Sequence, residues 1–167
     1  HTTGELMPIG IKARHLDRTT ALYNKNQLAH LAERGWLDGV SRISRANAVW
    51  EDASQSLDHR ARSYLDINCG HCHNAQGAAD TSGLLLDYED HSASSMGWCK
   101  PPIAAGRGSG GHSYGIVPGH ADDSILSFRM ATTDPGMMMP ELGRSLVHEE
   151  GLTLVSDWIN SLEGQCL

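Results

Sequence analysis

Aromatic side chains are scarce in this chain of 167 residues, where one Phe, four Trp and four Tyr make up 5% of the sequence. A core with so few large rings is lean for this length unless another large apolar group fills it. No apolar run is long enough to span a membrane, and no secretory signal peptide is visible. The length allows one domain with a real core and is too short for two.

Basic side chains are also in the minority, with 13 Lys and Arg against 20 Asp and Glu, so the formal net charge is −7. No basic stripe is present that would neutralise a phosphate backbone, and nucleic acid is therefore not an expected partner. An acidic surface favours a positively charged protein partner or simply maintains solubility.

Two of the four cysteines stand in the run Cys69-Gly70-His71-Cys72-His73. Thiols at this spacing can each add to one vinyl group of a haem, and a histidine directly after the second can coordinate the iron. The motif therefore predicts one covalent haem c, attached through Cys69 and Cys72, with His73 as the proximal ligand. The alternatives are a zinc site completed by Cys99, or two buried cysteines beside an exposed histidine.

Cys99 and Cys166 are the two cysteines outside the motif, so they can pair as a disulfide. Such a bond would close a loop of 67 residues and contribute at most about 4 kcal/mol in the chain-entropy model. It would require an oxidising compartment, which is also where bacteria attach haem covalently. We therefore expect a periplasmic, secreted or cell-surface bacterial protein. Because the chain begins at His1, we expect a processed protein or a domain of a larger exported one.

Apolar spacing predicts four helices. The helix that leads into Cys69 would hold both thiols and the imidazole on one rigid element. Residues 1–55 are expected to form an N-terminal extension with one short helix, packed on a haem domain of residues 56–167. The predicted helices cover residues 26–34, which end at Gly35, and residues 56–68, 122–130 and 149–162.

Long stretches between these helices are irregular. Residues 97–119 are rich in glycine and proline, and within them Gly106, Gly108 and Gly111 match G-x-G-x-x-G. A dinucleotide site needs a strand before this motif and a helix after it, and neither is indicated, so cofactor phosphate binding is not expected. The short apolar run at residues 84–86 could lie against a haem edge or anchor a loop.

A haem iron bound by one imidazole needs a sixth ligand, and that ligand decides the function. Met139 is the candidate, because Pro140 favours an extended conformation at the residue before it. Met138 or Met137 could replace it, and His112 or His120 would give bis-histidine ligation. Three consecutive methionines also serve as adaptable core packing.

The order of these features resembles a class I cytochrome c domain over residues 56–163. The finer pattern is similar to mono-haem c modules of larger secreted bacterial proteins, including modules appended to carbohydrate-binding proteins and proposed to reduce copper polysaccharide monooxygenases. The resemblance implies an all-α cytochrome c-like fold with long irregular loops around one haem. It implies thioether bonds at Cys69 and Cys72, and His73 and Met139 as axial ligands. The features that carry it are the Cys69-x-x-Cys72-His73 helix, Lys100-Pro101-Pro102, Val117-Pro118-Gly119, Met139-Pro140 and Asp157-Trp158-Ile159.

The function implied is that of an electron carrier, not an enzyme, which passes single electrons to or from a redox partner protein. A copper polysaccharide monooxygenase or a dehydrogenase is the expected kind of partner. The alternative is a haem enzyme or a gas or peroxide sensor, in which the methionine dissociates and His112 or His120 serves as a distal acid–base group.

The chain departs from small class I cytochromes in its N-terminal extension and in its long loop over residues 74–119. The proximal imidazole N–H of a haem protein usually binds a backbone carbonyl. That segment is expected near Pro101, Pro102 or Pro118. Arg107 or Arg129 would pair with a haem propionate or lie solvated on the surface.

Overall fold

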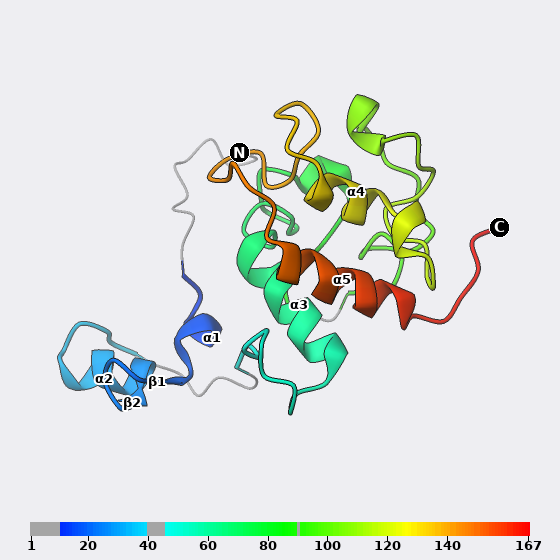
Figure 1. Cartoon of the computed structure of the whole chain (residues 1–167). Helices are drawn as coiled ribbons and strands as arrows, with labels where there is room; N and C mark the ends of the chain where they lie inside the picture. The colour runs from blue at the N-terminus through cyan, green and yellow to red at the C-terminus, as the bar shows by residue number, and fades with distance from the viewer. Residues whose placement is uncertain (1–10, 40–45, 90) are drawn as a thin grey trace.

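The computed structural model describes residues 11–39, 46–89 and 91–167. Within these ranges the chain forms five α-helices, three short 3₁₀ helices and one small sheet, connected by long loops (Figure 1). In chain order the elements are α1 (Ala13–Leu16), β1 (Thr19–Thr20), β2 (Lys25–Asn26), α2 (Gln27–Glu33), α3 (Leu57–Asn68), η1 (Asp80–Ser82), η2 (Gly106–Ser109), η3 (Ala121–Asp123), α4 (Ile125–Ala131) and α5 (Glu149–Asn160).

The prediction of an all-α, class I cytochrome c-like fold is wrong. β1 and β2 form an antiparallel sheet in which Thr19 pairs with Asn26, and most of the described chain is turn and loop. The hairpin forms because Asn24, at φ 49°, takes the left-handed conformation that asparagine tolerates. The chain is therefore mixed and loop-rich.

Helices α3 and α5 cross at the centre of the molecule, and α4 lies beside α5 (Figure 1). Ser56 caps α3 by accepting a hydrogen bond from the His59 N–H, and acidic residues in the first turn of α5 complement its dipole. Trp158 of α5 is buried, and its indole N–H donates to the Asp58 carboxylate at 3.1 Å. Trp158 therefore packs in the core and connects α5 to the first turn of α3. The core around it contains Ala61, Leu65, Leu86, Ile116, Leu126, Leu154, Val155 and Ile159.

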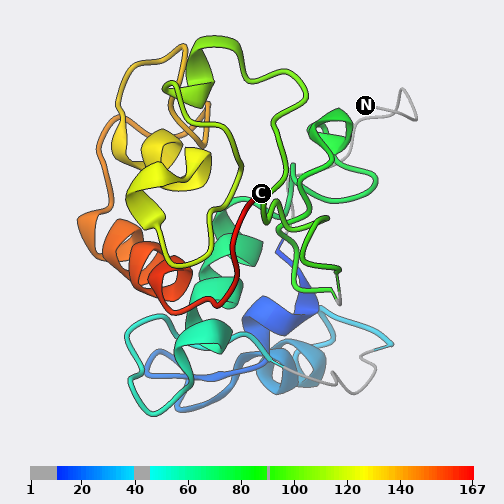
Figure 2. The same ribbon diagram turned by 90° about the vertical axis from the view of Figure 1, so that its right-hand side faces the viewer.

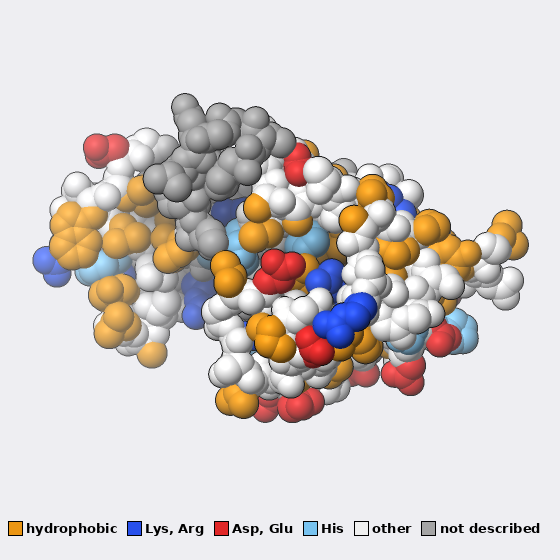
Figure 3. Space-filling view, turned by 90° about the horizontal axis from the view of Figure 1, so that it is seen from above, with side chains coloured by type: hydrophobic (Ala, Val, Ile, Leu, Met, Phe, Trp, Pro, Cys, Tyr) orange, Lys and Arg blue, Asp and Glu red, His pale blue; other side chains and the backbone are white. Residues whose placement is uncertain are grey.

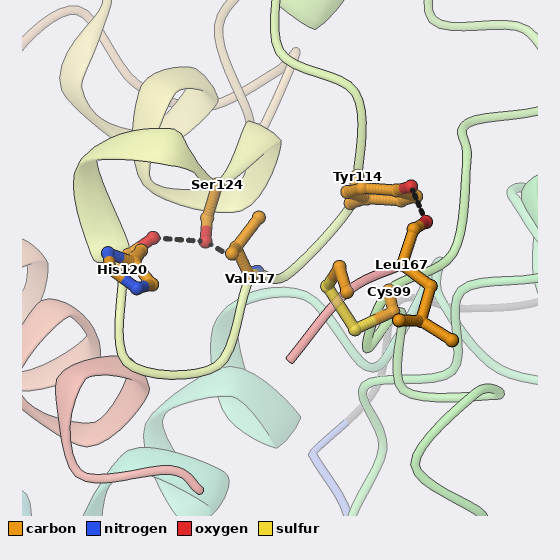
Figure 4. The surroundings of a disulfide bond; sticks show 7 residues. Cys99, Tyr114, Val117, His120, Ser124 and Leu167 are labelled. Carbon is orange, nitrogen blue, oxygen red and sulfur yellow. Dashed lines mark hydrogen bonds between the residues drawn. A yellow bond between two sulfur atoms is a disulfide. The ribbon is translucent and has the colours of Figure 1, made fainter. Parts of the chain in front are cut away.

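The predicted positions of α2, α3 and α5 are confirmed, including the stop at Gly35, which takes φ 67°. The helix predicted over residues 122–130 begins later, because its first residues form η3 instead. Ser124 is extended there, and its hydroxyl accepts from the Val117 N–H and donates to the His120 carbonyl (Figure 4). These bonds hold Ser124 out of the helix, so α4 begins at Ile125.

The disulfide between Cys99 and Cys166 is present, which confirms that prediction. It connects the glycine-rich loop to the C-terminal tail, which runs back beside that loop in Figure 2. Tyr114 strengthens the connection by donating its hydroxyl to the Leu167 carbonyl at 2.8 Å (Figure 4). Because Cys99 is oxidised, it cannot complete the zinc site considered above.

The N-terminal extension contains α1 as well as α2, so the expectation of a single short helix there was incomplete. Its sheet and α2 form a small lobe at one side of the body, and α1 joins the two (Figure 1). No helix in the described ranges is both long and apolar enough to cross a membrane. Figure 3 shows acidic, basic and hydrophobic side chains interspersed over one face, with no broad basic area among the residues drawn in colour.

Candidate functional site

The Cys-x-x-Cys-His motif is a tight turn built directly on the end of α3. Cys69 is the C-cap residue, and its N–H and that of Gly70 both donate to the Leu65 carbonyl. The N–H groups of Cys72 and His73 then donate to the Cys69 carbonyl at 3.0 and 2.9 Å. Consecutive backbone bonds therefore hold both thiols and the imidazole on one element, with no loop between them.

Both cysteines of the motif are free thiols and are partly buried. Cys69 packs against the hydrophobic core. Burial raises the pKa of the Cys69 thiol to about 12, and the neighbouring Cys72 contributes to the rise. Two unpaired thiols, one of them packed against the core, fit covalent attachment of a large apolar group.

The imidazole of His73 is oriented by the segment that follows η1. Its Nδ1 donates to the Leu84 carbonyl at 3.3 Å, and the Ser82 hydroxyl lies at 3.4 Å. Since a carbonyl only accepts, the proton is on Nδ1 and the lone pair is on Nε2, which is the arrangement that a metal-binding histidine needs. Burial lowers the pKa of His73, and the bond to the Leu84 carbonyl opposes that effect.

This contact corrects one prediction. The carbonyl that accepts from His73 belongs to Leu84, not to a residue near Pro101, Pro102 or Pro118. The Leu86 N–H also donates to the His73 carbonyl at 2.8 Å, and the Leu86 side chain is buried. The apolar run at residues 84–86 therefore has two roles. The buried Leu86 side chain anchors the loop, and the Leu84 carbonyl orients the imidazole.

The three consecutive methionines lie in a segment held by the end of α4. The Met139 N–H donates to the Arg129 carbonyl at 2.9 Å, and Arg129 Nε donates to the Met137 carbonyl at 2.8 Å. Met138 is buried as a core residue, whereas Met139 is only partly buried. Met138 would have to leave its packing to bind a haem iron, whereas Met137 and Met139 are both only partly buried.

His73 and the methionine segment are close enough to interact electrostatically. After burial and the Leu84 bond, the pKa of His73 responds to Arg129, which lowers it, and to Glu141, which raises it. Arg129 is bonded to the backbone of the methionine segment, and Glu141 is two residues beyond Met139. Arg129 and Glu141 therefore link His73 electrostatically to the segment that carries Met139.

His112 and His120 lie elsewhere. Both line an open groove of about 530 Å³ beside the disulfide, together with Tyr114, Pro118 and Cys166. None of the motif residues lines this groove, and the His112 ring packs against Phe128 at 5.7 Å. The structure does not bring either histidine to the motif, so it does not favour bis-histidine ligation or a distal acid–base role for them.

The three glycines of the G-x-G-x-x-G match have conformational or packing roles. Gly106 and Gly111 take left-handed backbone conformations, and Gly108 lies against Arg129. A Cβ at Gly108 would lie 3.1 Å from Cζ of Arg129, so this glycine makes room for the guanidinium. Arg129 is therefore partly buried and bonded to backbone, and is not a solvated surface arginine. Arg107 is exposed, 3.8 Å from Asp134, as the surface interpretation had it.

Two contributors to the site were missed from the sequence. Arg144 donates to the carbonyls of Met130, Arg129 and Thr132 and so holds the end of α4. Asp66 is a buried carboxylate one turn before Cys69. Asp66 did carry a signal, since a charged residue on the apolar face of a helix needs partners. Arg144 carried none, because its partners are backbone carbonyls.

In comparisons with known proteins, the chain matched no family model, no curated protein and no solved structure. Among the residues that the structure describes, no cluster of three or more His, Cys, Asp or Glu side chains is arranged to hold a metal ion. The interpretation of the site therefore depends on the motif and its geometry. Two free thiols and an imidazole with Nδ1 engaged fit a covalently attached haem.

Proposed function

We propose that this chain is an electron-transfer module with one haem c, related to class I cytochromes c through its motif order. The observation that carries the proposal is the His73 Nδ1 bond to the Leu84 carbonyl, on the same turn as two free thiols. Cys69 and Cys72 form the thioether bonds, His73 presents Nε2 as the proximal ligand, and Met139 supplies the sixth. When bound, the haem supplies reversible one-electron chemistry.

The contacts of the methionine segment support electron transfer over catalysis. Backbone bonds to Arg129 and the guanidinium of Arg144 hold this segment to α4. A sixth ligand held in place keeps the reorganisation on electron transfer small. A haem enzyme or sensor would instead need a displaceable ligand and a distal acid–base residue, and the groove that His112 and His120 line includes no residue of the motif.

The disulfide between Cys99 and Cys166 supports a location in an oxidising compartment, the bacterial periplasm or outside the cell. We propose a redox partner protein of the secreted oxidoreductase class, such as a copper polysaccharide monooxygenase or a dehydrogenase. The net charge of −7 favours a partner with a basic docking face.

The experiment that separates a carrier from a haem enzyme is the spectrum of the oxidised protein, produced in a periplasm with haem-attachment machinery. We expect the weak band at the red end that marks methionine–iron coordination, and slow binding of cyanide. The matched controls are His112→Ala and His120→Ala, which should change neither property. A protein that lacks the band and binds cyanide immediately contradicts the electron-carrier proposal.

A further inference from the structure

Asp66 is a carboxylate buried in the protein, one turn before Cys69 on α3, with a side chain that is 0% exposed. A buried carboxylate is unfavourable unless charged or hydrogen-bonding groups surround it. Each oxygen of Asp66 has several such partners. Oδ1 accepts from Lys12 Nζ at 2.5 Å and from the Tyr88 N–H at 3.1 Å, while Oδ2 accepts from His15 Nε2 and Asn47 Nδ2, both at 3.0 Å, with Arg14 Nε at 3.7 Å.

These partners come from segments that are far apart in the sequence. Lys12, Arg14 and His15 belong to α1 and its N-cap, in the N-terminal extension. Tyr88 belongs to the segment that follows Leu84. Asp66 is therefore the point at which the extension, α3 and the segment of residues 84–88 meet.

The extension also holds Tyr88 directly. Arg14 Nη1 donates to the Tyr88 carbonyl at 3.1 Å, and its guanidinium lies over the Tyr88 ring at 4.0 Å from the centroid. Arg62 of α3 approaches the same ring at 4.9 Å. Tyr88 is fixed through its N–H, its carbonyl and its ring, so this end of the segment has little freedom.

The other end of the segment is the carbonyl that holds the proximal histidine. Leu84 accepts from His73 Nδ1, and the Leu86 N–H donates to the His73 carbonyl. A Cβ at Gly70 would lie 2.8 Å from Cα of Asp87 and 2.8 Å from the Asp66 carbonyl oxygen. The segment is therefore in backbone contact with the end of α3. Because of this close packing, we expect a displacement of Tyr88 to be passed along the backbone to Leu84.

We propose that Asp66 is a positioning residue for His73, and that the N-terminal extension is part of the haem site through it. By binding Lys12, His15 and the Tyr88 N–H together, Asp66 sets residues 84–88 so that the Leu84 carbonyl faces His73 Nδ1. This inference rests on the proposed function in that His73 binds the haem iron. A firm Nδ1–H bond makes the imidazole a more basic ligand and favours ferric iron, so loosening it raises the reduction potential.

The test uses the haem-loaded full chain and its Asp66→Asn, Lys12→Gln, Lys12→Arg and Asp122→Asn variants. Asp122 is an exposed carboxylate on η3 and is the matched control. We expect Asp66→Asn to speed hydrogen exchange of the Tyr88 and Leu86 amides by about tenfold or more and to raise the reduction potential. Lys12→Gln should change the exchange rates and the reduction potential in the same directions, but less. Lys12→Arg should keep both near their wild-type values, and Asp122→Asn should change neither.

Faster exchange with an unchanged potential overturns the positioning role, because the extension would then be docked on Asp66 without acting on His73. If Asp66→Asn does not fold, Lys12→Gln decides by the same two readouts, since the Lys12 side chain is 37% exposed and removable. If the wild-type chain binds no haem, the proposed function fails. The exchange rate of Leu86 in Lys12→Gln then still decides whether the extension controls the segment at His73.

Discussion

The two sides of the proposed iron site are built differently. On the proximal side, His73 lies on the turn that ends α3, where its N–H donates to the Cys69 carbonyl and its Nδ1 donates to the Leu84 carbonyl. On the distal side, Met139 lies in a loop whose position depends on Arg129 and Arg144 at the end of α4. The proposed proximal ligand is thus held by the turn at the end of α3 together with the Leu84 carbonyl, and the proposed distal ligand by two arginine side chains that bind nearby backbone.

The largest expected effect is on the proximal side. His73→Ala removes the proximal nitrogen and the partner of the Leu84 carbonyl, so we expect almost no haem-loaded protein to accumulate. The measurement is haem absorbance per purified chain, with His112→Ala as the control, because His112 lines the groove beside the disulfide. A normal haem content in His73→Ala would show that the proximal side is not the more important of the two for haem binding.

Arg144→Leu should have the next largest effect. Arg144 makes three charge-assisted bonds to backbone carbonyls, so its loss should lower the free energy of unfolding by about 2–3 kcal/mol. The matched control is Arg107→Leu, whose exposed pair with Asp134 is worth about 0.2–1 kcal/mol. Denaturant unfolding measures both. Equal effects of the two substitutions would remove the special role of Arg144 in holding the distal segment.

Met139→Ala should leave the haem attached and change only the distal side. We expect the sixth position to open, the red-end band to disappear and the reduction potential to fall, because a thioether stabilises ferrous iron. The stability should drop by about 1–2 kcal/mol, since Met139 is only partly buried. Met138→Ala is the comparison, and a lost band in that variant instead would move the ligand to Met138.

The smallest effect is a difference in acid sensitivity between the two sides. Burial alone would raise the pKa of Asp66, but hydrogen bonds from Lys12, Asn47 and His15 outweigh it and hold that pKa below its ordinary value. The stabilisation from Asp66 is therefore complete above about pH 4 and is lost as the pH falls through the folded pKa. The basic groups that face Asp66 are Lys12, Arg14 and His15.

Unfolding free energies between about pH 5 and pH 2 check this difference. Asp66→Asn should show a shallower loss of stability in acid than the wild-type chain. Substitution of Arg144 should leave the slope unchanged, because its partners are carbonyls that do not titrate. Parallel curves for the wild-type chain and Asp66→Asn would contradict the assignment of acid sensitivity to the proximal side.

The same contrast explains what could be predicted from the sequence. The helices α2, α3 and α5 have apolar residues at helical spacing and clear caps, and the disulfide followed from the cysteines left over by the motif. The hairpin of β1 and β2 has only two residues per strand, too short for an alternating pattern. Ser124 delays the start of the predicted helix through its contacts with Val117 and His120.

The site divides in the same way. Cys69, Cys72 and His73 are a local motif and are visible in the sequence. The Leu84 carbonyl is not, because every residue has a carbonyl and only the fold selects one. The resemblance to cytochromes c pointed to residues by their order along the chain and implied long loops, but the all-α fold that it implied is not the mixed fold in which they lie.

The most direct test of the central claim is the mass of the peptide that contains Cys69 to His73, taken from denatured protein made with haem-attachment machinery. We predict that the peptide carries one haem through both cysteines, and that Cys69→Ala with Cys72→Ala abolishes the attachment. A peptide of unmodified mass with two free thiols, from a protein that is folded and stable, would contradict the account.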